Sequence, residues 1–285
     1  MHHRKSRRWL YHLFGALALP ISFLANALYR GLTTVRYALR TDKLANGQTV
    51  RIALLTDLHD AVHGENQSDL IDRLRGLAPD LILLSGDMCD DVSRLGGASL
   101  LMPRIAPMAP CYYVTGSHDL YRPDIEQLKQ SFRALGVRVL EGDCEALMIR
   151  GARLTICGLD DPTRFPRREE RRLFAQALSA FQSLPADTFN ILVAHRPDYI
   201  DEYQKLPVDL VVSGHAHGGQ VRMPPLVNGL YAPNQGLFPR YDGGLYRVGG
   251  VSMAVSRGLS YHPALPRVFN PPELVVIDLS GGPAR

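Results

Sequence analysis

The sequence predicts an α/β protein whose functional groups lie at the ends of its strands. From Gln48 onward, short apolar runs alternate with segments of helical periodicity. Most of the apolar runs end in aspartate or histidine, as residues 52–60 and 208–217 do. Since ligands of open α/β sheets bind beyond the carboxyl ends of strands, these endings point to one shared site.

The first 43 residues differ in composition from the rest. Residues 9–29 carry no formal charge over 21 positions, close to the ~20 that a helix needs to cross a bilayer, and a basic octet precedes them. We expect a single-pass membrane anchor or an export signal in residues 1–43, with retention as an anchor favoured, and a catalytic domain over residues 44–285. Ser6-Arg7-Arg8 resembles a twin-arginine signal, which favours an extracytoplasmic domain, with the cytoplasmic face as the alternative.

The charge distribution argues against a nucleic-acid partner. Residues 1–43 hold eight Lys or Arg and one acid, so the remaining chain carries 24 basic and 27 acidic residues. A net negative body does not offer the basic face that phosphate backbones require. The four cysteines show no C-x-x-C spacing and leave the redox compartment open.

The elements follow in order along the body. Apolar runs predict strands over 49–57, 80–87, 111–116, 189–195, 208–215 and 273–279. Three consecutive short strands, 137–140, 145–150 and 153–160, imply antiparallel pairing, and 244–250 with 251–258 form a hairpin-like pair. Apolar spacing predicts helices over 68–78, 124–136 and 167–181.

The polar residues at the strand ends are of two kinds, carboxylates and imidazoles. Together these groups suit zinc, manganese or iron, and several strand ends can hold two ions roughly 3.5 to 4 Å apart. The candidates are Asp57, His59, Asp87, His118, His195, His215 and His217.

The motifs D-x-H, G-D, G-S-H-D, H and G-H-x-H, in this order, resemble the calcineurin-like metallophosphoesterase superfamily. GHAHGGQ and residues 255–277 look like the membrane-associated bacterial branch of that family. The resemblance implies a four-layer α/β/β/α sandwich of two mixed sheets. It also implies two divalent ions, manganese, zinc or iron, with a hydroxide between them that attacks phosphorus.

Carried over residue by residue, the resemblance divides the ligands between the two ions. A carboxylate has two oxygens and can span two cations, whereas imidazoles fill terminal positions. The first ion takes Asp57, His59 and His217, the second takes His195 and His215, and Asp87 bridges them.

The stretch Ser117-His118-Asp119 follows another strand. The resemblance implies that His118 acts as general acid, with Asp119 orienting its ring, and the alternative is that His118 supports the metal shell through hydrogen bonds. The family usually has asparagine as a metal ligand where this chain has Ser117. A serine hydroxyl is shorter and a weaker donor of electron density, so we expect looser binding of the second ion.

Three more polar residues lie near these motifs. His63 either reaches the substrate or is a solvated loop histidine. Asp90 and Asp91 are either a solvated pair or helix cap, or groups that contact the metal ligands.

The expected activity is hydrolysis of a phosphodiester or pyrophosphate bond in a lipid-linked substrate, by a monomer held at the cell membrane. The branch that the chain resembles includes phosphodiesterases and a UDP-2,3-diacylglucosamine pyrophosphatase of lipid A biosynthesis. The alternative is a catalytically impaired metal-binding regulatory module of the same fold, which Ser117 alone motivates.

Overall fold

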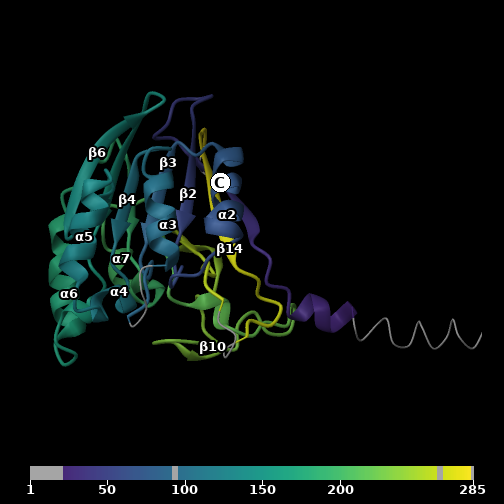
Figure 1. Ribbon diagram of the computed structural model, residues 1–285. Helices are drawn as coiled ribbons and strands as arrows, with labels where there is room; N and C mark the ends of the chain where they lie inside the picture. The colour runs from purple at the N-terminus through teal and green to yellow at the C-terminus, as the bar shows by residue number, and fades with distance from the viewer. Residues whose placement is uncertain (1–21, 92–95, 262–265, 284–285) are drawn as a thin grey trace, which may run out of the picture.

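The structure, a computed structural model, describes residues 22–91, 96–261 and 266–283. Two six-stranded mixed sheets form the body (Figure 1). The first has the order β1-β14-β2-β3-β4-β5, and the second has the order β12-β13-β9-β8-β7-β6. In each sheet four neighbouring strands run parallel, and antiparallel partners stand beside them.

The strands have the following bounds. The first sheet contains β1 (Thr33–Thr41), β2 (Thr49–Leu55), β3 (Leu81–Ser85), β4 (Cys111–Val114), β5 (Arg138–Val139) and β14 (Glu273–Gly281). The second contains β6 (Asp143–Ile149), β7 (Ala152–Gly158), β8 (Phe189–Val193), β9 (Leu210–Ser213), β12 (Gly244–Val248) and β13 (Val251–Val255). A small separate hairpin consists of β10 (Tyr231–Ala232) and β11 (Gly236–Leu237).

Helices connect and cover the strands. They are α2 (Ser68–Leu77), α3 (Gly96–Ile105), α4 (Ser117–Tyr121), α5 (Ile125–Ala134), α6 (Glu170–Leu178) and α7 (Ile200–Tyr203). The predicted helices over 68–78, 124–136 and 167–181 correspond to α2, α5 and α6. Residues 22–27 form a further short helix.

Three apolar cores separate the layers. Between the sheets, side chains such as Ile52 and Leu54 of β2 meet Ile191 and Val193 of β8. Alternate residues of β2 to β4 face the other way, onto α2, α3 and α5. The outer face of the second sheet packs on α6 and α7. Strands buried on both faces explain the nearly continuous apolar runs in the sequence.

The predicted start of the domain is too late. Residues 33–41, placed with the anchor on sequence grounds, form β1, which pairs in parallel with β14 along its whole length. The folded body therefore begins before Leu44. β14 in turn pairs antiparallel with β2, so it lies between the first two strands of the chain.

The strand over 137–140 is also placed differently from the prediction. Of the three strands predicted to pair antiparallel, two do so, β6 and β7, in which Cys144 and Cys157 lie opposite each other and are joined by a disulfide. β5 instead extends the first sheet in parallel with β4. The hairpin-like pair is confirmed as β12 and β13.

The predicted membrane segment, residues 9–29, lies mostly outside the described residues. Within the described ranges, no helix has the length and apolar character that crossing a membrane requires.

A buried lysine ties α5 to the second sheet. The side chain of Lys129 is fully buried, and its Nζ lies 2.7 Å from Oε1 of Glu141 and 3.1 Å from Oδ2 of Asp160. Asp160 follows β7 and is itself buried, where it also accepts a hydrogen bond from Thr115. Asp160 also pairs with Arg164, whose side chain is 52% exposed, so removal of Lys129 would leave the buried carboxylate with only a partly solvated cation.

We therefore predict that Lys129→Met lowers the free energy of unfolding by about 3 kcal/mol, because Asp160 keeps its burial and loses a cation. Urea denaturation at neutral pH measures the change. Lys205→Met is the matched control, since Lys205 is 62% exposed and pairs with Glu202 at the surface. An equal effect of both substitutions would contradict a special role for Lys129.

Candidate metal centre

The predicted site residues come together because the two sheets direct their carboxyl ends to one edge. Asp57, Asp87 and Ser117 follow β2, β3 and β4 of the first sheet. His195 and His215 follow β8 and β9 of the second. The candidate centre therefore lies across the junction of the sheets, as expected for parallel strands that end together.

The backbone turns sharply at these positions. Asp57, His59, Asp87, His215 and His217 all have positive φ, between 44° and 66°. Residues other than glycine adopt this left-handed conformation rarely and at a cost, and such residues cluster at functional sites. Gly116 permits the close approach of the β4 loop, since a Cβ there would lie 2.1 Å from Oδ1 of Asp87.

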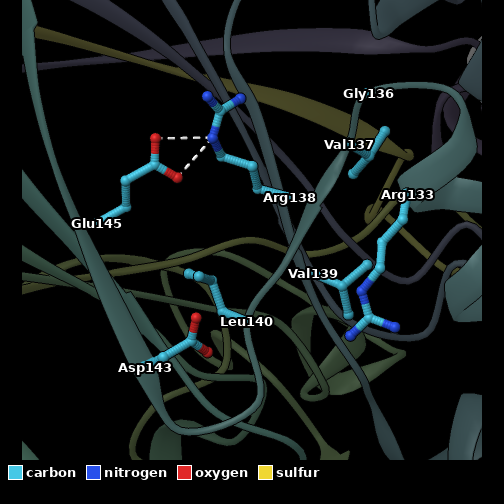
Figure 2. A pocket seen from close by; sticks show the side chains of 8 residues that line it. All are labelled: Arg133, Gly136, Val137, Arg138, Val139, Leu140, Asp143 and Glu145. Carbon is cyan, nitrogen blue, oxygen red and sulfur yellow. Dashed lines mark hydrogen bonds and ion pairs between the residues drawn. The ribbon is translucent and has the colours of Figure 1, made fainter.

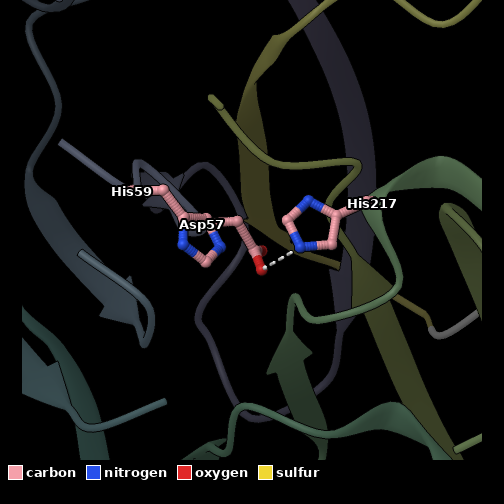
Figure 3. A group of neighbouring side chains, drawn as sticks. All are labelled: Asp57, His59 and His217. Atoms are coloured by element: carbon pink, nitrogen blue, oxygen red, sulfur yellow. Dashed lines mark ion pairs between the residues drawn. The ribbon is translucent and has the colours of Figure 1, made fainter. Parts of the chain in front are cut away.

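Asp57, His59 and His217 form the first group of candidate ligands. Figure 3 shows the two imidazole rings on either side of the Asp57 carboxylate. Nε2 of His217 lies 3.5 Å from Oδ1 of Asp57, whose oxygens also accept the backbone N–H of His215. Burial lowers the pKa of His217 to about 3, so its ring is neutral and has a lone pair available for a cation.

Asp87, His195 and His215 form the second group, and all three are buried. Nε2 of His195 lies 3.1 Å from Oδ2 of Asp87 and 3.2 Å from Nδ1 of His215. The same Asp87 oxygen lies 3.6 Å from Nε2 of His59 in the first group. One carboxylate thus faces ligands of both groups, which is the geometry expected of a bridge.

The charge balance of the centre favours bound cations. Burial alone would raise the pKa of Asp87, but the imidazoles of His195, His59 and His118 hold it well below its usual value. Burial alone would lower the pKa of His195, yet Asp87 and then Asp57 raise it to about 10. Two buried carboxylates therefore require positive charge beside them, which divalent ions would supply.

Buried polar atoms without hydrogen-bond partners also indicate that the centre binds cations. Oδ2 of Asp87 and Nε2 of His59 are buried, and within the described part of the chain neither has a hydrogen-bond partner. Buried polar atoms are almost always paired, and an ion is one of the accepted reasons for an exception. Neutral nitrogen and anionic oxygen donors fit zinc, manganese or iron.

The outer ring nitrogens of the second group are held by other parts of the chain. Nδ1 of His195 donates to the carbonyl of Ser85 at 2.8 Å, which leaves Nε2 facing Asp87. Nε2 of His215 lies 2.6 Å from Oδ1 of Asn234, in the loop between β10 and β11. Such contacts fix the tautomer and orientation of a ligand. Sequence reasoning missed Asn234, for which the only signal was its position soon after the last motif.

The expected role of Asp119 is wrong. Its carboxylate accepts hydrogen bonds from the backbone N–H groups of Gly116, Cys89 and Met88 and does not contact the His118 ring in the described contacts. Burial and the charge of Asp87 raise its pKa to about 6. Asp119 therefore holds the loops after β3 and β4 together.

His118 is instead flanked by the pair Asp90 and Asp91. Its Nδ1 lies 3.4 Å from Oδ1 of Asp90 and 3.8 Å from Oδ1 of Asp91. Its side chain is 39% exposed and packs edge-on against the His59 ring. The pair thus belongs to the surroundings of the centre rather than to open solvent.

The prediction for Ser117 stays open, whereas the structure decides the role of His63. Ser117 is buried at the start of α4, between two residues whose backbones approach Asp87, and its role as a ligand stays a prediction. His63 is also buried, with Nε2 donating to the carbonyl of Leu259 at 2.9 Å. It is neither solvated nor directed at the candidate ligands, so its role is structural.

A separate hollow lies between β5 and β6. Figure 2 shows its lining side chains, among them the ion pair of Arg138 and Glu145. None of the candidate ligands lines it. The chemistry suggested by the strand ends therefore does not involve this hollow.

Comparison with known proteins agrees with the arrangement of the centre. The chain is 28% identical to an uncharacterized metallophosphoesterase of Aquifex aeolicus, covering 88% of this chain and 92% of that protein. It is 27% identical to one of Bacillus subtilis, with 96% of both chains covered. It is also 27% identical to a zebrafish (Danio rerio) protein named as a transmembrane protein with a metallophosphoesterase domain, covering 81% of this chain but only 53% of that one.

The family model of the calcineurin-like phosphoesterases matches residues 50–219, more than half of the chain. The matched segment contains every candidate ligand from Asp57 to His217. Together with the two mixed sheets, this match settles the family. The chain belongs to the calcineurin-like phosphoesterases.

Proposed function

We propose that the chain is a metal-dependent phosphoesterase that hydrolyses a phosphodiester or pyrophosphate bond of a lipid-linked substrate. The observation that carries this proposal is the position of Asp87 between the two groups of candidate ligands, with Oδ2 near both His195 and His59. Paired sites of this kind clamp the attacking and leaving oxygens of a displacement at phosphorus.

The membrane part of the proposal rests on the sequence and on relatives. Residues 9–29 have the length and composition of a membrane-spanning segment. Relatives from zebrafish and cattle are named as transmembrane proteins. A lipid-linked substrate suits an enzyme held at a membrane, because both then diffuse in the same two dimensions.

The residues of the chain divide the work between them. When bound, divalent ions would lower the pKa of a water molecule and offset charge on the phosphoryl oxygens. Asp57 is held in place by the backbone N–H of His215, and Asp87 by that of His118 at 2.8 Å. The exposed edge of His118 is available to pass a proton to the leaving oxygen.

The bridge gives the first test. We expect Asp87→Asn to lower turnover of bis(4-nitrophenyl) phosphate by at least ~100-fold, because it removes the carboxylate charge that both groups share. Elemental analysis after dialysis should show less bound metal than in the parent protein. Asp72→Asn, at a 70% exposed position on α2, is the control and should change neither value. Normal turnover of the Asp87 variant would exclude the bridge.

The general acid gives the second test. His118→Ala should keep its bound metal, since other residues make up both groups, and should lose activity according to the leaving group. We expect a loss of about 100-fold for an alkyl leaving group, which needs a proton, and only a few-fold for 4-nitrophenolate, which does not. Equal losses on both substrates would mean that His118 has a supporting role.

The contact of Asn234 with His215 gives the third test. Asn234→Ala frees the imidazole to rotate, and we expect the affinity for zinc or manganese to fall by about 10- to 100-fold. Competition with a chelator measures this change without reference to activity. Asn228→Ala is the matched control, because Asn228 is exposed in the segment just before β10. Unchanged affinity in the Asn234 variant would show that the hydrogen bond is incidental.

A further inference from the structure

Exposed apolar side chains gather on the loop that follows the candidate centre. Leu226, Leu237 and Phe238 are 79%, 67% and 66% exposed. With them we define the hairpin surface as the exposed side chains of residues 223–238, namely Met223, Leu226, Leu230, Tyr231, Leu237 and Phe238. Exposed apolar side chains that gather on a protein surface normally mark an interaction site.

The strand β10, which belongs to this loop, lies in the lower part of the view in Figure 1, as does the start of the described chain. Residues 268–269 connect the two. The backbone N–H of Arg222 bonds to the carbonyl of Val268, and that of Phe269 bonds to the carbonyl of Ala27. The rings of Phe23 and Phe269 also pack edge-on, 5.2 Å apart.

The chain that precedes the folded body indicates what covers the surface. Residues 9–29 carry no formal charge, and exposed Phe23, Leu24, Leu28 and Tyr29 continue that apolar run up to the folded body. A segment of this length and composition fits a bilayer core. It would bring the hairpin surface to the level of the lipid headgroups.

The charges around the hairpin surface also favour a bilayer as the occupant. Residues 223–241 contain no aspartate or glutamate and include the exposed Arg240, whereas the nearby Arg222 is mostly buried and pairs with Asp242. Residues 22–30 are likewise free of acids and end in the exposed Arg30. Aromatic and aliphatic side chains bordered by arginine are typical of surfaces that lie in a membrane interface. A protein partner would not require the absence of acidic residues.

We propose that the hairpin surface docks on a bilayer that contains anionic lipids, with its apolar side chains at the boundary between headgroups and acyl chains. The loop would then link the membrane to the centre directly. Asn234 lies within it and contacts His215, and the N–H of Leu230 bonds to the carbonyl of Gly219, next to the last histidine motif. The docking itself does not depend on the proposed activity. Its consequence, that a lipid-linked phosphate reaches the centre from this side, rests on the proposed function.

Fluorescence quenching in the full chain tests whether the hairpin surface itself, and not only residues 9–29, contacts the lipid. Phe238→Cys is labelled with bimane, and the protein is reconstituted in vesicles of phosphatidylethanolamine and phosphatidylglycerol with or without acyl-chain nitroxide lipids. Cys89 and Cys111 are buried and Cys144 is bonded to Cys157, so the label goes to the new thiol. We expect the nitroxide lipids to remove about half of the fluorescence.

Met148→Cys is the matched control, since Met148 is 68% exposed on β6, outside the hairpin surface. Its label should not respond to the nitroxide lipids. Equal quenching of both labels, or quenching of neither, would overturn the proposal. Shielding of the label at position 238 from solvent in detergent would also overturn the proposal. Shielding that depends on protein concentration would identify a second copy as the occupant. Shielding that does not would identify residues 1–21.

Activity on a soluble substrate separates the two proposals. The double variant with Leu237→Ser and Phe238→Ser should hydrolyse bis(4-nitrophenyl) phosphate at a rate within about twofold of the parent rate, because neither side chain belongs to the centre. If the metal-loaded parent is inactive while the label at position 238 is quenched, the proposed function fails and the docking stands. If the parent is active and the label is not quenched, only the docking fails.

Discussion

The face-to-face packing of the two sheets is the constraint on which the site depends. Neither sheet carries a complete set of candidate ligands, since Asp57, His59 and Asp87 follow strands of the first and His195 and His215 follow strands of the second. The apolar core between the sheets fixes their relative position, because protein interiors are close-packed. A change in that core would alter the distances across the centre before it altered either sheet.

The loops at the strand ends are held in an unfavourable backbone conformation and would relax if left alone. Several contacts oppose this. Thr56 donates to Asp57, the backbone of His215 donates to the same carboxylate, and Asp119 accepts from the loops after β3 and β4. Part of the stability supplied by the cores is therefore used to hold imidazoles and carboxylates at distances that suit ions. The strained loops therefore lie directly beside the rigid sheets that support them.

Much of this arrangement could be predicted, because strands buried on both faces leave continuous apolar runs and the polar residues follow them within a few positions. Other features leave no such trace. β1 was missed because its outward residues, among them Arg36 and Arg40, interrupt the apolar pattern of a strand at the sheet edge. Asp119 was misjudged because side chains of neighbouring residues in a helical turn do not face each other. Asn234 reaches His215 from an irregular loop, and no periodicity connects the two.

The position of β14 has a consequence for the order of events during synthesis. It is the last strand of the described chain to be made, yet it lies between β1 and β2, which are the first. Until residues 273–281 have left the ribosome, those two strands have no partner between them, and the first sheet contains an open slot with exposed edges. The first sheet therefore closes only once β14 has been made, and chaperones have a defined unfinished species to protect until then.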